Sequence, residues 1–578
     1  MSKRTGFLAA VGVVGLQLAA IVPDAAAHLT DSQSATSTSA ADMVFVGAPI
    51  YTVDACRRWA EAMAVKNGKI VYVGDEKHAK EFRGEKTAFV QLHGGMILPG
   101  FHDCHVHPLE SGIEQQRLTL EDCQSVEALW NKVKVFADKS PKEPWVIASG
   151  WQLPLFPNAN PLNDRLDGII ADRPALLVSQ DAHSALANSC ALRKAGITKD
   201  TPDPPHGKIE RNANGEPTGT LRESAIDLVQ RHVPKSDAAL RRTGLLFALK
   251  KANGFGITSM QDAHANEDFL QTYRQLEDEG LLTSRMVTAL GVDPDKDPHQ
   301  VDDFVRLRNK YMSALVRPIS AKIFADGVVE SHTAALLEPY SDDSANYGLL
   351  NFSPDKLKEV VRLLDKNGFQ VHVHAIGDRA VHETLNAFED ARKINGVNDN
   401  RHQIAHLELI QKSDLPRFRE LGVVANFQAY WAFNDPYIVK STVPAVGAER
   451  AAHLYPIKSV LETGAVLAGG SDWSVSSMNP LDAIQVGITR QGVEEGDEKQ
   501  EPLTPSERVS LADMIVIYTI NGAYDNHEES TNGSIEVGKA ADFIVLDHNL
   551  FELPPSEIHK THVTETYLNG RKVFQRVP

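Results

Sequence analysis

The stretch Met96-Ile-Leu-Pro-Gly-Phe-His-Asp-Cys-His-Val-His107 joins an apolar run to a pair of histidines. Residues i and i+2 of a β-strand point to the same face, so the imidazoles of His105 and His107 can bind one metal ion. The pair alone decides little, because 22 histidines in 578 residues give about one His-x-His pair by chance. A second pair, His372-Val-His374, does occur. Either pair taken alone is compatible with surface or core histidines, so the surrounding sequence must decide.

Metal-binding residue types recur along the chain, each directly after an apolar, strand-like run. After the first pair come Lys322, His374, His406 and Asp472. Each precedes polar or glycine-rich sequence typical of a loop. In a (β/α)₈ barrel, catalytic residues lie at the carboxyl ends of parallel strands. We therefore expect these residues to meet the first pair at the mouth of such a barrel.

The middle of the chain, from about Ile97 to Ile520, alternates short apolar runs with longer helical patterns. Strands are expected at Ala175–Ser179, Ile257–Met260, Ala321–Phe324, Phe369–Val373, Val423–Asn426 and Ala465–Ala468, and helices at Leu357–Lys366 and Val381–Lys393. This alternation predicts βα units and a parallel sheet. We place a metal-dependent (β/α)₈ barrel at residues 98–525. The stretch from about 108 to 254 is too long for one βα unit, so we expect an insertion there that covers the barrel mouth.

Both ends of the chain carry strand-like runs separated by turn residues. Asn67-Gly68 lies between two such runs and predicts a β-hairpin, and Asn569-Gly570 marks a similar turn near the C-terminus. Two β-rich ends around a long middle predict a small β-sandwich domain built from residues 42–97 and 526–578. The predicted fold class is therefore α/β: a (β/α)₈ TIM-like barrel with a small β-sandwich domain built from both chain ends.

Composition is ordinary for a globular enzyme, with 42% hydrophobic and 23% charged residues. The chain has 59 Lys and Arg against 76 Asp and Glu, a net charge of −17. It has no basic run that could follow a phosphate backbone, so nucleic acid is not an expected partner. Four cysteines are too few for a disulfide scaffold, although they are enough for one or two disulfide bonds.

The first 27 residues have the order of a secretory signal peptide. Lys3 and Arg4 precede the mostly apolar run from Phe7 to Val22, and Ala25-Ala-Ala27 offers a small-residue cleavage site. A retained anchor helix is the alternative, but the run is short for a membrane span. We expect cleavage near His28, a linker over residues 28–41, a periplasmic or secreted protein, and no stable membrane insertion after cleavage.

Seven segments of the chain carry a family resemblance. They are Leu98–His107, Asp181–Asn188, Gly215–Glu223, Lys322–Gly327, His374–Arg379, Gly470–Trp473 and Gly533–Asp542. Together they resemble the amidohydrolase superfamily, and in particular its YtcJ-like branch, which includes N-substituted formamide deformylases. The likeness runs from about residue 42 to the C-terminus.

The resemblance implies a site for one or two divalent metal ions, with zinc as the expected metal. His105 and His107 would hold the more buried ion, and His374 and His406 would hold the second. Lys322 would be carbamylated by CO₂ and bridge the two ions. A free ammonium group cannot bind a metal, whereas a lysine carbamate offers two anionic oxygens.

Asp472 is the residue to which the resemblance gives the catalytic role. It would bind metal and act as the general base for the attacking water. The chemistry agrees, because a metal lowers the pKa of bound water to about 7. A carboxylate beside that water can take its proton and pass it to the leaving amine.

Two residues depart from the family pattern. His102 stands where an aliphatic residue is common, and Cys104 where Ser or Thr is common. We expect a structural role for Cys104, which alternates away from the ligand face. We expect His102 and His372 to support the site or to pack in the core.

Six further residues are candidates for contacting the substrate: Trp151, Asp181, His183, Asp378, Arg379 and Gln428. Asp181 and His183 lie in the suspected insertion, where a polar loop is the simpler interpretation. A buried packing role is the simpler one for Trp151, and a structural ion pair for Asp378 with Arg379.

The sequence favours hydrolysis of a non-peptide C–N bond in a small amide, N-acyl or N-formyl compound. One alternative is a mononuclear deaminase of a cyclic amidine, against which Lys322 argues because one-metal members usually lack the bridging ligand. Another is a non-catalytic regulatory protein on the same fold, against which the full ligand set argues. The expected partner is a small-molecule substrate, and the sequence is also compatible with a homodimer.

Overall fold

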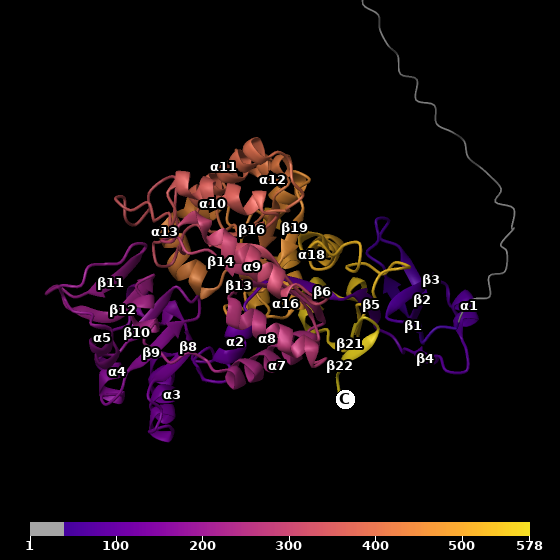
Figure 1. Ribbon diagram of the computed structural model, residues 1–578, viewed down its shortest axis with the longest axis horizontal. Helices are drawn as coiled ribbons and strands as arrows, with labels where there is room; N and C mark the ends of the chain where they lie inside the picture. Colours follow the sequence, from indigo (N-terminus) through magenta and orange to yellow (C-terminus); the bar gives the residue numbers. More distant parts are fainter. Residues whose placement is uncertain (1–39, 578) are drawn as a thin grey trace, which may run out of the picture. The chain divides into compact units, whose positions relative to one another are not determined.

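Eight parallel strands form the centre of the structure, a computed structural model that describes residues 40–577 (Figure 1). Their order in the sheet follows their order in the sequence. From one edge to the other they are β6 (Phe101–Val106), β13 (Ile257–Ala265), β14 (Arg285–Gly291), β15 (Val316–Phe324), β16 (Gln370–Ala375), β17 (Gln403–His406), β18 (Val424–Phe427) and β19 (Leu467–Gly469). The two edges meet just beyond the strands, where the Asp472 amide donates to the His105 carbonyl at 2.7 Å. The predicted (β/α)₈ barrel is confirmed.

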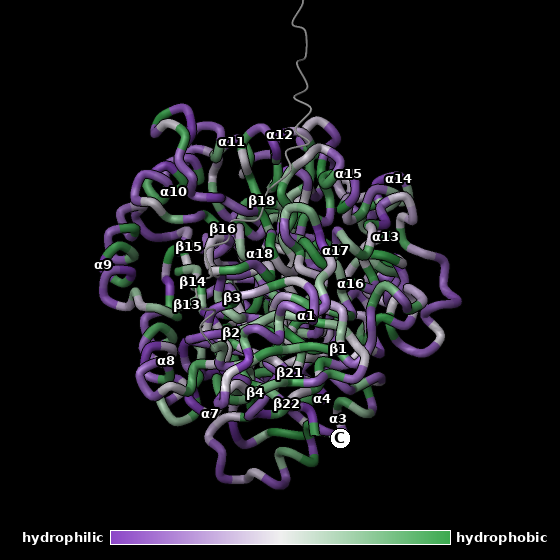
Figure 2. Tube along the Cα trace, turned by 90° about the vertical axis from the view of Figure 1, so that its right-hand side faces the viewer, coloured by the Kyte–Doolittle hydropathy of each residue, from purple (hydrophilic) through white to green (hydrophobic). Residues whose placement is uncertain are grey.

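Helices on the outside of the barrel are amphipathic and capped. α10 (Pro354–Lys366) begins after Ser353, whose side chain accepts a hydrogen bond from the Lys356 amide, and it buries Leu357 and Val361 against the strands. The main helices of this layer are α7 (Ala238–Gly254), α8 (Glu267–Asp278), α9 (Val301–Tyr311), α10, α11 (Asp378–Asn395), α12 (Leu415–Leu421) and α15 (Ile457–Glu462). Along α8, α9 and α10 in Figure 2, hydrophilic and hydrophobic residues alternate as a helix with one buried face requires.

An inserted sheet of six strands lies in the sequence between α2 (Pro108–Glu114) and α7. Its order is β11 (Gly207–Arg211), β12 (Pro217–Glu223), β10 (Ser184–Ala187), β9 (Ala175–Ser179), β8 (Val146–Trp151) and β7 (Leu118–Thr119). The run Ala175–Ser179 is therefore a strand, but of this sheet and not of the barrel. The insertion contacts the barrel mouth, because the Gln180 side chain donates to the Val475 carbonyl in the loop after β19.

Strands from both chain ends form a third, separate sheet. Its path is β22 (Arg571–Gln575), β21 (Val563–Leu568), β20 (Phe543–Leu546), β5 (Met96–Pro99), β1 (Met43–Tyr51), β2 (Trp59–Lys66) and β3 (Lys69–Gly74), with β4 (Ala88–Gln91) paired to β1. Asn67 and Gly68 have φ values of 50° and 74°, and Asn569 and Gly570 values of 50° and 70°, as two-residue hairpin turns require. The prediction that the two ends pair is confirmed.

The predicted signal peptide at residues 1–27, and the linker up to residue 39, lie outside the described residues. Among residues 40–577 we find no helix long and apolar enough to cross a membrane. The four cysteines, Cys56, Cys104, Cys123 and Cys190, are all free thiols.

Candidate metal centre and substrate cavity

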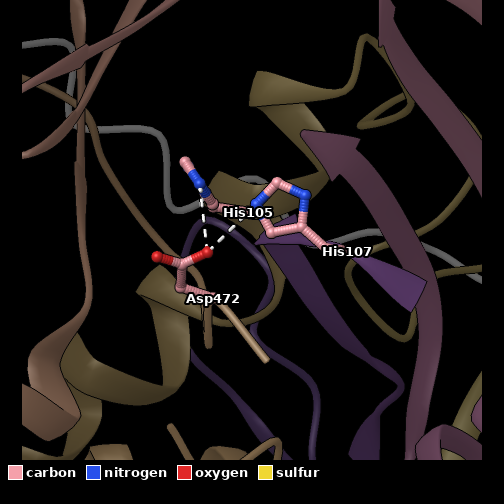
Figure 3. A group of neighbouring side chains, drawn as sticks. All are labelled: His105, His107 and Asp472. Carbon is pink, nitrogen blue, oxygen red and sulfur yellow. Dashed lines mark ion pairs between the residues drawn. The ribbon is translucent and has the colours of Figure 1, made fainter. Parts of the chain in front are cut away.

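Three of the predicted ligands converge at the carboxyl end of β6 (Figure 3). The Asp472 carboxylate oxygen Oδ1 lies 3.2 Å from His107 Nε2 and 3.5 Å from His105 Nε2. One ligand atom from each of the three residues lies within 4.8 Å of the other two. No other group of three His, Cys, Asp or Glu residues in residues 40–577 meets this criterion. Imidazole nitrogens with a carboxylate oxygen are the donor set that zinc prefers.

The three remaining predicted ligands surround this trio. Lys322 Nζ lies 3.3 Å from His105 Nε2, and the His406 ring lies 4.7 Å from the His105 ring and 4.4 Å from the His374 ring. Strand register explains the gathering, because Phe324 of β15 pairs with His374 of β16, and Ala375 pairs with His406 of β17. The structure therefore brings all six predicted ligands to one place.

His372 contacts the trio directly. Its Nε2 lies 2.8 Å from Nδ1 of His105. His374 instead faces the cavity and directs Nε2 to the Gly327 carbonyl at 3.0 Å. A histidine that binds a metal commonly donates its other ring N–H to a carbonyl oxygen. This arrangement gives His372 a supporting position and leaves Nδ1 of His374 for a ligand.

Several buried polar atoms in this cluster lack a hydrogen-bond partner. They are Nδ1 of His107, His372 and His406. Unpaired buried polar atoms are costly in a folded protein. Burial lowers the pKa of His105 and His406 well below the ordinary value, so both rings are neutral, as metal binding requires. The residues present fit a divalent metal ion.

Lys322 is completely buried at the bottom of the cluster. Burial lowers the pKa of its ammonium group to about 7. A sizeable share of these side chains is therefore the neutral amine near pH 7. Only the neutral amine can add to CO₂, so the environment suits the predicted carbamate.

Backbone strain gathers at the same place. His406 and Leu407 have φ values of 80° and 57°, and Asp472 has a φ of 53°. Such values are uncommon for residues other than glycine and concentrate at functional sites. Gly470 allows the close approach, because a Cβ atom there would lie 2.5 Å from the His105 Cβ atom.

Two further aspartates hold the site from outside the ligand set. Asp103 accepts hydrogen bonds from the Ser471 amide at 2.9 Å and the Ser471 hydroxyl at 2.6 Å, which fixes the turn that carries Asp472. Asp326 accepts from the amides of Ala335, Ile376 and Gly377 and so ties the loop after β15 to the loop after β16. Both are positioning residues, and the sequence analysis assigned no role to Asp103.

A cavity of about 500 Å³ opens beside the metal ligands. His374, His406 and Asp472 form part of its wall, and the inserted sheet contributes Asp181 and His183. His183 pairs with Glu223 at 2.7 Å. Burial alone would lower the pKa of His183, but Glu223 outweighs it and raises the value to about 9. Two of the predicted substrate contacts thus reach the cavity.

The other predicted substrate contacts lie elsewhere. The Trp151 indole is packed in the core of the inserted sheet and donates to the Leu177 carbonyl at 2.8 Å. Gln428 is buried beside Asn426, to which it donates at 3.2 Å. Asp378 accepts from the Leu337 amide at 2.9 Å, and no ion pair joins it to Arg379. None of these four side chains lines the cavity described above.

Sequence reasoning missed a group of acidic residues in the cavity wall. Glu330, Glu408 and Asp435 all line it, together with aromatic side chains. Burial raises the pKa of Asp435 to about 7 and also raises the pKa of Glu330. Glu408 carries the only signal that the sequence could have offered, because it lies two residues after His406.

The fold and the site together define a barrel with a metal centre at the carboxyl ends of its strands. A family model described as the Amidohydrolase family matches residues 88–574. The chain belongs to this family.

Relatives align over most of their length. The chain is 30% identical to the Protein LONG AFTER FAR-RED 3 of Arabidopsis thaliana over 92% of each chain. It is 29% identical to the putative amidohydrolase YtcJ of Bacillus subtilis, over 92% of this chain and 99% of that protein. It is 25% identical to the N-substituted formamide deformylase of Arthrobacter pascens, over 93% and 99% respectively. The resemblance inferred from the motifs is confirmed.

Solved structures agree with the fold. An uncharacterized metal-dependent hydrolase from Pyrococcus horikoshii superimposes with a TM-score of 0.71 at 23% identity, over 89% of this chain and 99% of that one. One from Pyrococcus furiosus gives 0.67 at 25% identity over the same shares. Relatives that align over less of this chain include the exoenzymes regulatory protein AepA of Pectobacterium carotovorum, 30% identical over 66% of this chain, and a 5-methylthioadenosine/S-adenosylhomocysteine deaminase of Shouchella clausii, 26% identical over 38% of this chain. The protein is thus a metal-dependent hydrolase of the amidohydrolase kind.

Proposed function

We propose that this protein hydrolyses a non-peptide C–N bond in a small amide, N-acyl or N-formyl compound, with Asp472 as general base. The observation that carries the proposal is the convergence of His105, His107 and Asp472, with Lys322 3.3 Å from His105, beside a cavity that Asp472 lines. The likeness to a relative named N-substituted formamide deformylase supports the choice of bond.

One or two divalent metal ions, with zinc as the expected metal, would be held by His105, His107, His374, His406, Asp472 and a carbamate on Lys322. When bound, the metal acidifies water and polarises a carbonyl group. The carbamate forms when the neutral Lys322 amine adds to CO₂ and loses a proton. His372 supports the site by its 2.8 Å contact with His105.

Asp472 moves the proton. Its carboxylate takes one proton from the attacking water as the new C–O bond forms at the amide carbon. The C–N bond then breaks, and the same carboxyl group gives that proton to the leaving nitrogen, so that an amide and water yield a carboxylic acid and an amine. The three hydrogen bonds around Asp103 and Ser471 keep Asp472 in position for both transfers.

Two other functions within this fold make different demands. A mononuclear deaminase of a cyclic amidine has no use for a bridging lysine, whereas Lys322 is fully buried beside the metal ligands. A regulatory protein needs no metal site, whereas here the unpartnered buried nitrogens of His107 and His406 lie at the candidate metal site. Two metal ions per chain would favour the hydrolase over the deaminase, and no metal ion would favour the regulatory protein.

The test is a hydrolysis screen over N-formyl amines, N-acyl amines, lactams and esters, with added zinc or manganese and bicarbonate. We expect amine release from at least one amide class, abolished by a chelator. Release of ammonia from a cyclic amidine, with every amide left intact, would favour the deaminase instead.

We also propose that the protein acts outside the cytoplasm on a small-molecule substrate. The order of charged, apolar and small residues in positions 1–27 supports this. N-terminal sequencing of the natively exported protein should give a start near His28. An intact Met1 on cytoplasmic material would contradict it.

A further inference from the structure

The cavity beside the metal ligands has one wall rich in carboxyl groups, which we call the acidic wall: Glu330, Glu408 and Asp435. We propose that the acidic wall binds an organic cation, so that the substrate carries a protonated amine or a similar cationic group on one side of the bond that is cleaved. The cation site stands on the observations below, and only its coupling to hydrolysis rests on the proposed function.

The carboxyl groups of the acidic wall form no ion pair in the described part of the chain, because the one imidazolium in the same cavity wall, His183, is paired with Glu223. Among the ion pairs of residues 40–577, none involves Glu330, Glu408 or Asp435. Glu408 is 3% exposed, and its Oε2 atom has no hydrogen-bond partner at all. A buried carboxyl oxygen without a donor is costly. An N–H group of a bound ligand would supply the missing donor.

The other contacts of these residues fix them without neutralising them. The Thr442 hydroxyl donates to Glu330 at 2.7 Å, and the Ile438 amide donates to Asp435 at 2.8 Å. The Tyr455 amide donates to the Glu408 carbonyl at 2.9 Å, and Tyr455 has a φ of 51°, a strained value for a bulky residue. The acidic wall is thus a built feature of the cavity, held by the helical segment Ile438–Thr442 and by the turn at Tyr455.

Aromatic rings line the cavity next to the acidic wall. They are Tyr430, Trp431, Phe433, Tyr437 and Tyr455. Carboxylates beside aromatic faces are the surroundings that attract organic cations, because the ring faces carry partial negative charge. The only Lys or Arg in the lining is Lys251, whose ammonium group lies over the rings of Trp473 and Phe255 at 5.5 and 5.8 Å.

A second metal ion does not fit the acidic wall. The ligand atoms of its three residues do not come together within 4.8 Å, since the group of His105, His107 and Asp472 alone meets that criterion in the described chain. Carboxyl groups spread over a wall, with aromatic rings between them, suit a larger and less charged cation than a metal ion.

The acidic wall and the metal ligands belong to one binding site. Glu408 follows His406 by two residues, and the His406 ring stacks on Trp431 with 5.3 Å between centroids and an interplanar angle of 1°. The acidic wall lines the same 500 Å³ cavity as three of the predicted ligands, His374, His406 and Asp472. One small molecule can therefore place a cationic group against the acidic wall and an amide carbonyl at the metal ligands.

The first experiment measures binding alone. Zinc-supplemented full-length protein is titrated calorimetrically with n-alkylammonium ions from propyl to hexyl, and with the n-alkanols of equal length. We expect at least one ammonium ion to bind tenfold or more tightly than its alcohol. Equal affinities, or tighter binding of the alcohols, would overturn the proposal.

Three variants locate the binding. Glu408→Gln, Glu330→Gln and Asp435→Asn each remove a charge but keep the shape, and the last two keep the oxygens that accept from Thr442 and Ile438. Each should weaken ammonium binding about tenfold, which is about 1.4 kcal/mol, and leave alcohol binding unchanged. Glu359→Gln on the exposed face of α10 is the matched control and should change neither. Unchanged ammonium binding in all three variants would mean that the cation binds elsewhere.

The second experiment separates this proposal from the proposed function. Hydrolysis of N-formyl ω-aminoalkylamines is compared with that of N-formyl alkylamines of equal length. Preference for the charged series, lost in Glu408→Gln, is the expected result. Cleavage of both series at equal kcat/KM would overturn the cation site but leave the hydrolase. Charge-dependent binding with no cleavage of any amide would overturn the hydrolase but leave the cation site.

Discussion

Two clusters of buried polar side chains, one towards each end of the barrel interior, differ in whether their polar atoms have hydrogen-bond partners. At the amino ends of the strands, the side chains of Gln261, Gln370 and Gln403 bond to one another at 2.6 to 3.1 Å, and Gln403 also donates to Asp525 at 2.9 Å. At the carboxyl ends, buried nitrogens of His107 and His406 have no partner. The glutamine side chains are hydrogen-bonded within the protein, whereas the histidine nitrogens need a partner that the chain does not supply.

This contrast distinguishes polar groups that hold the barrel together from polar groups that serve a ligand. A satisfied network such as the glutamine layer specifies the packing of the strands. An unsatisfied cluster lowers stability unless a ligand binds to it. We therefore expect changes at the glutamine layer to alter stability, and changes at the mouth to alter metal content and rate.

The largest effect is expected for Asp472→Asn. The amide keeps the shape of the side chain but has almost no basicity, so kcat should fall by about 10² to 10⁴ on any substrate found. Metal content should fall less than in His105→Ala, because Asp472 is one ligand among several. The measurement is kcat together with metal ions per chain. Asp302→Asn, on an exposed face of α9, is the control. Near-normal kcat at full metal content would remove Asp472 from the mechanism.

Lys322→Ala should have the second-largest effect on the rate. If Lys322 carries the proposed carbamate, the change removes the bridge, so at least one metal ion should be lost, and the rate should fall by about 10-fold to 100-fold or more, as losses around metal sites commonly do. Short carboxylic acids in the medium should restore part of the rate by filling the bridge. Elemental analysis and steady-state kinetics check this. Wild-type metal content and rate in the variant would mean that no carbamate bridge exists.

At the other end of the barrel, Gln403→Leu should act on stability. It removes the donor to Gln261 Oε1 and to Asp525 Oδ2 and leaves these two oxygens unpaired, at a cost of about 1–3 kcal/mol for each unsatisfied group. The thermal midpoint should drop, while metal ions per folded chain should stay the same. A variant that loses its metal at an unchanged midpoint would reverse the roles assigned to the two ends.

The smallest effect is expected at Asp365, a carboxylate whose oxygens are already hydrogen-bonded. Asp365 bonds to His402, Asn395 and Asn400. Burial alone would raise its pKa, but these hydrogen bonds outweigh burial and lower the pKa to about 2. Because the folded pKa lies below the ordinary value of 3.8, this group adds stability above pH 4 that disappears as the pH falls towards 2. Asp365→Asn should flatten the loss of stability in that window, measured by acid titration with circular dichroism. An identical acid transition in both proteins would contradict the assignment.

The sequence predicted the barrel and its ligands because both follow from local patterns. A strand that ends at a histidine, lysine or aspartate places that residue at the mouth wherever the strand belongs to the barrel. Trp151 shows the limit of this argument. It also ends a strand, but β8 belongs to the inserted sheet, and nothing in the local sequence tells the two kinds of strand apart.

The acidic wall could not be predicted for a related reason. Glu330 and Asp435 lie in the loops after β15 and β18, more than 100 residues apart, and they meet only because the barrel closes. Gln428 illustrates the opposite error, because it directly follows β18 yet lies buried beside Asn426. Loop conformation, which local periodicity does not determine, decides between the two outcomes.

The central claim is that the unsatisfied cluster at the mouth binds a metal ion and the satisfied layer does not. The direct test is the number of metal ions per chain in purified, zinc-supplemented and desalted protein, compared among the wild type, His105→Ala, His107→Ala and Gln403→Leu. We predict one or two ions in the wild type and in Gln403→Leu, and a loss of at least one ion in each histidine variant that remains folded. No bound metal in the wild type, or equal metal content in all four proteins, would contradict the account.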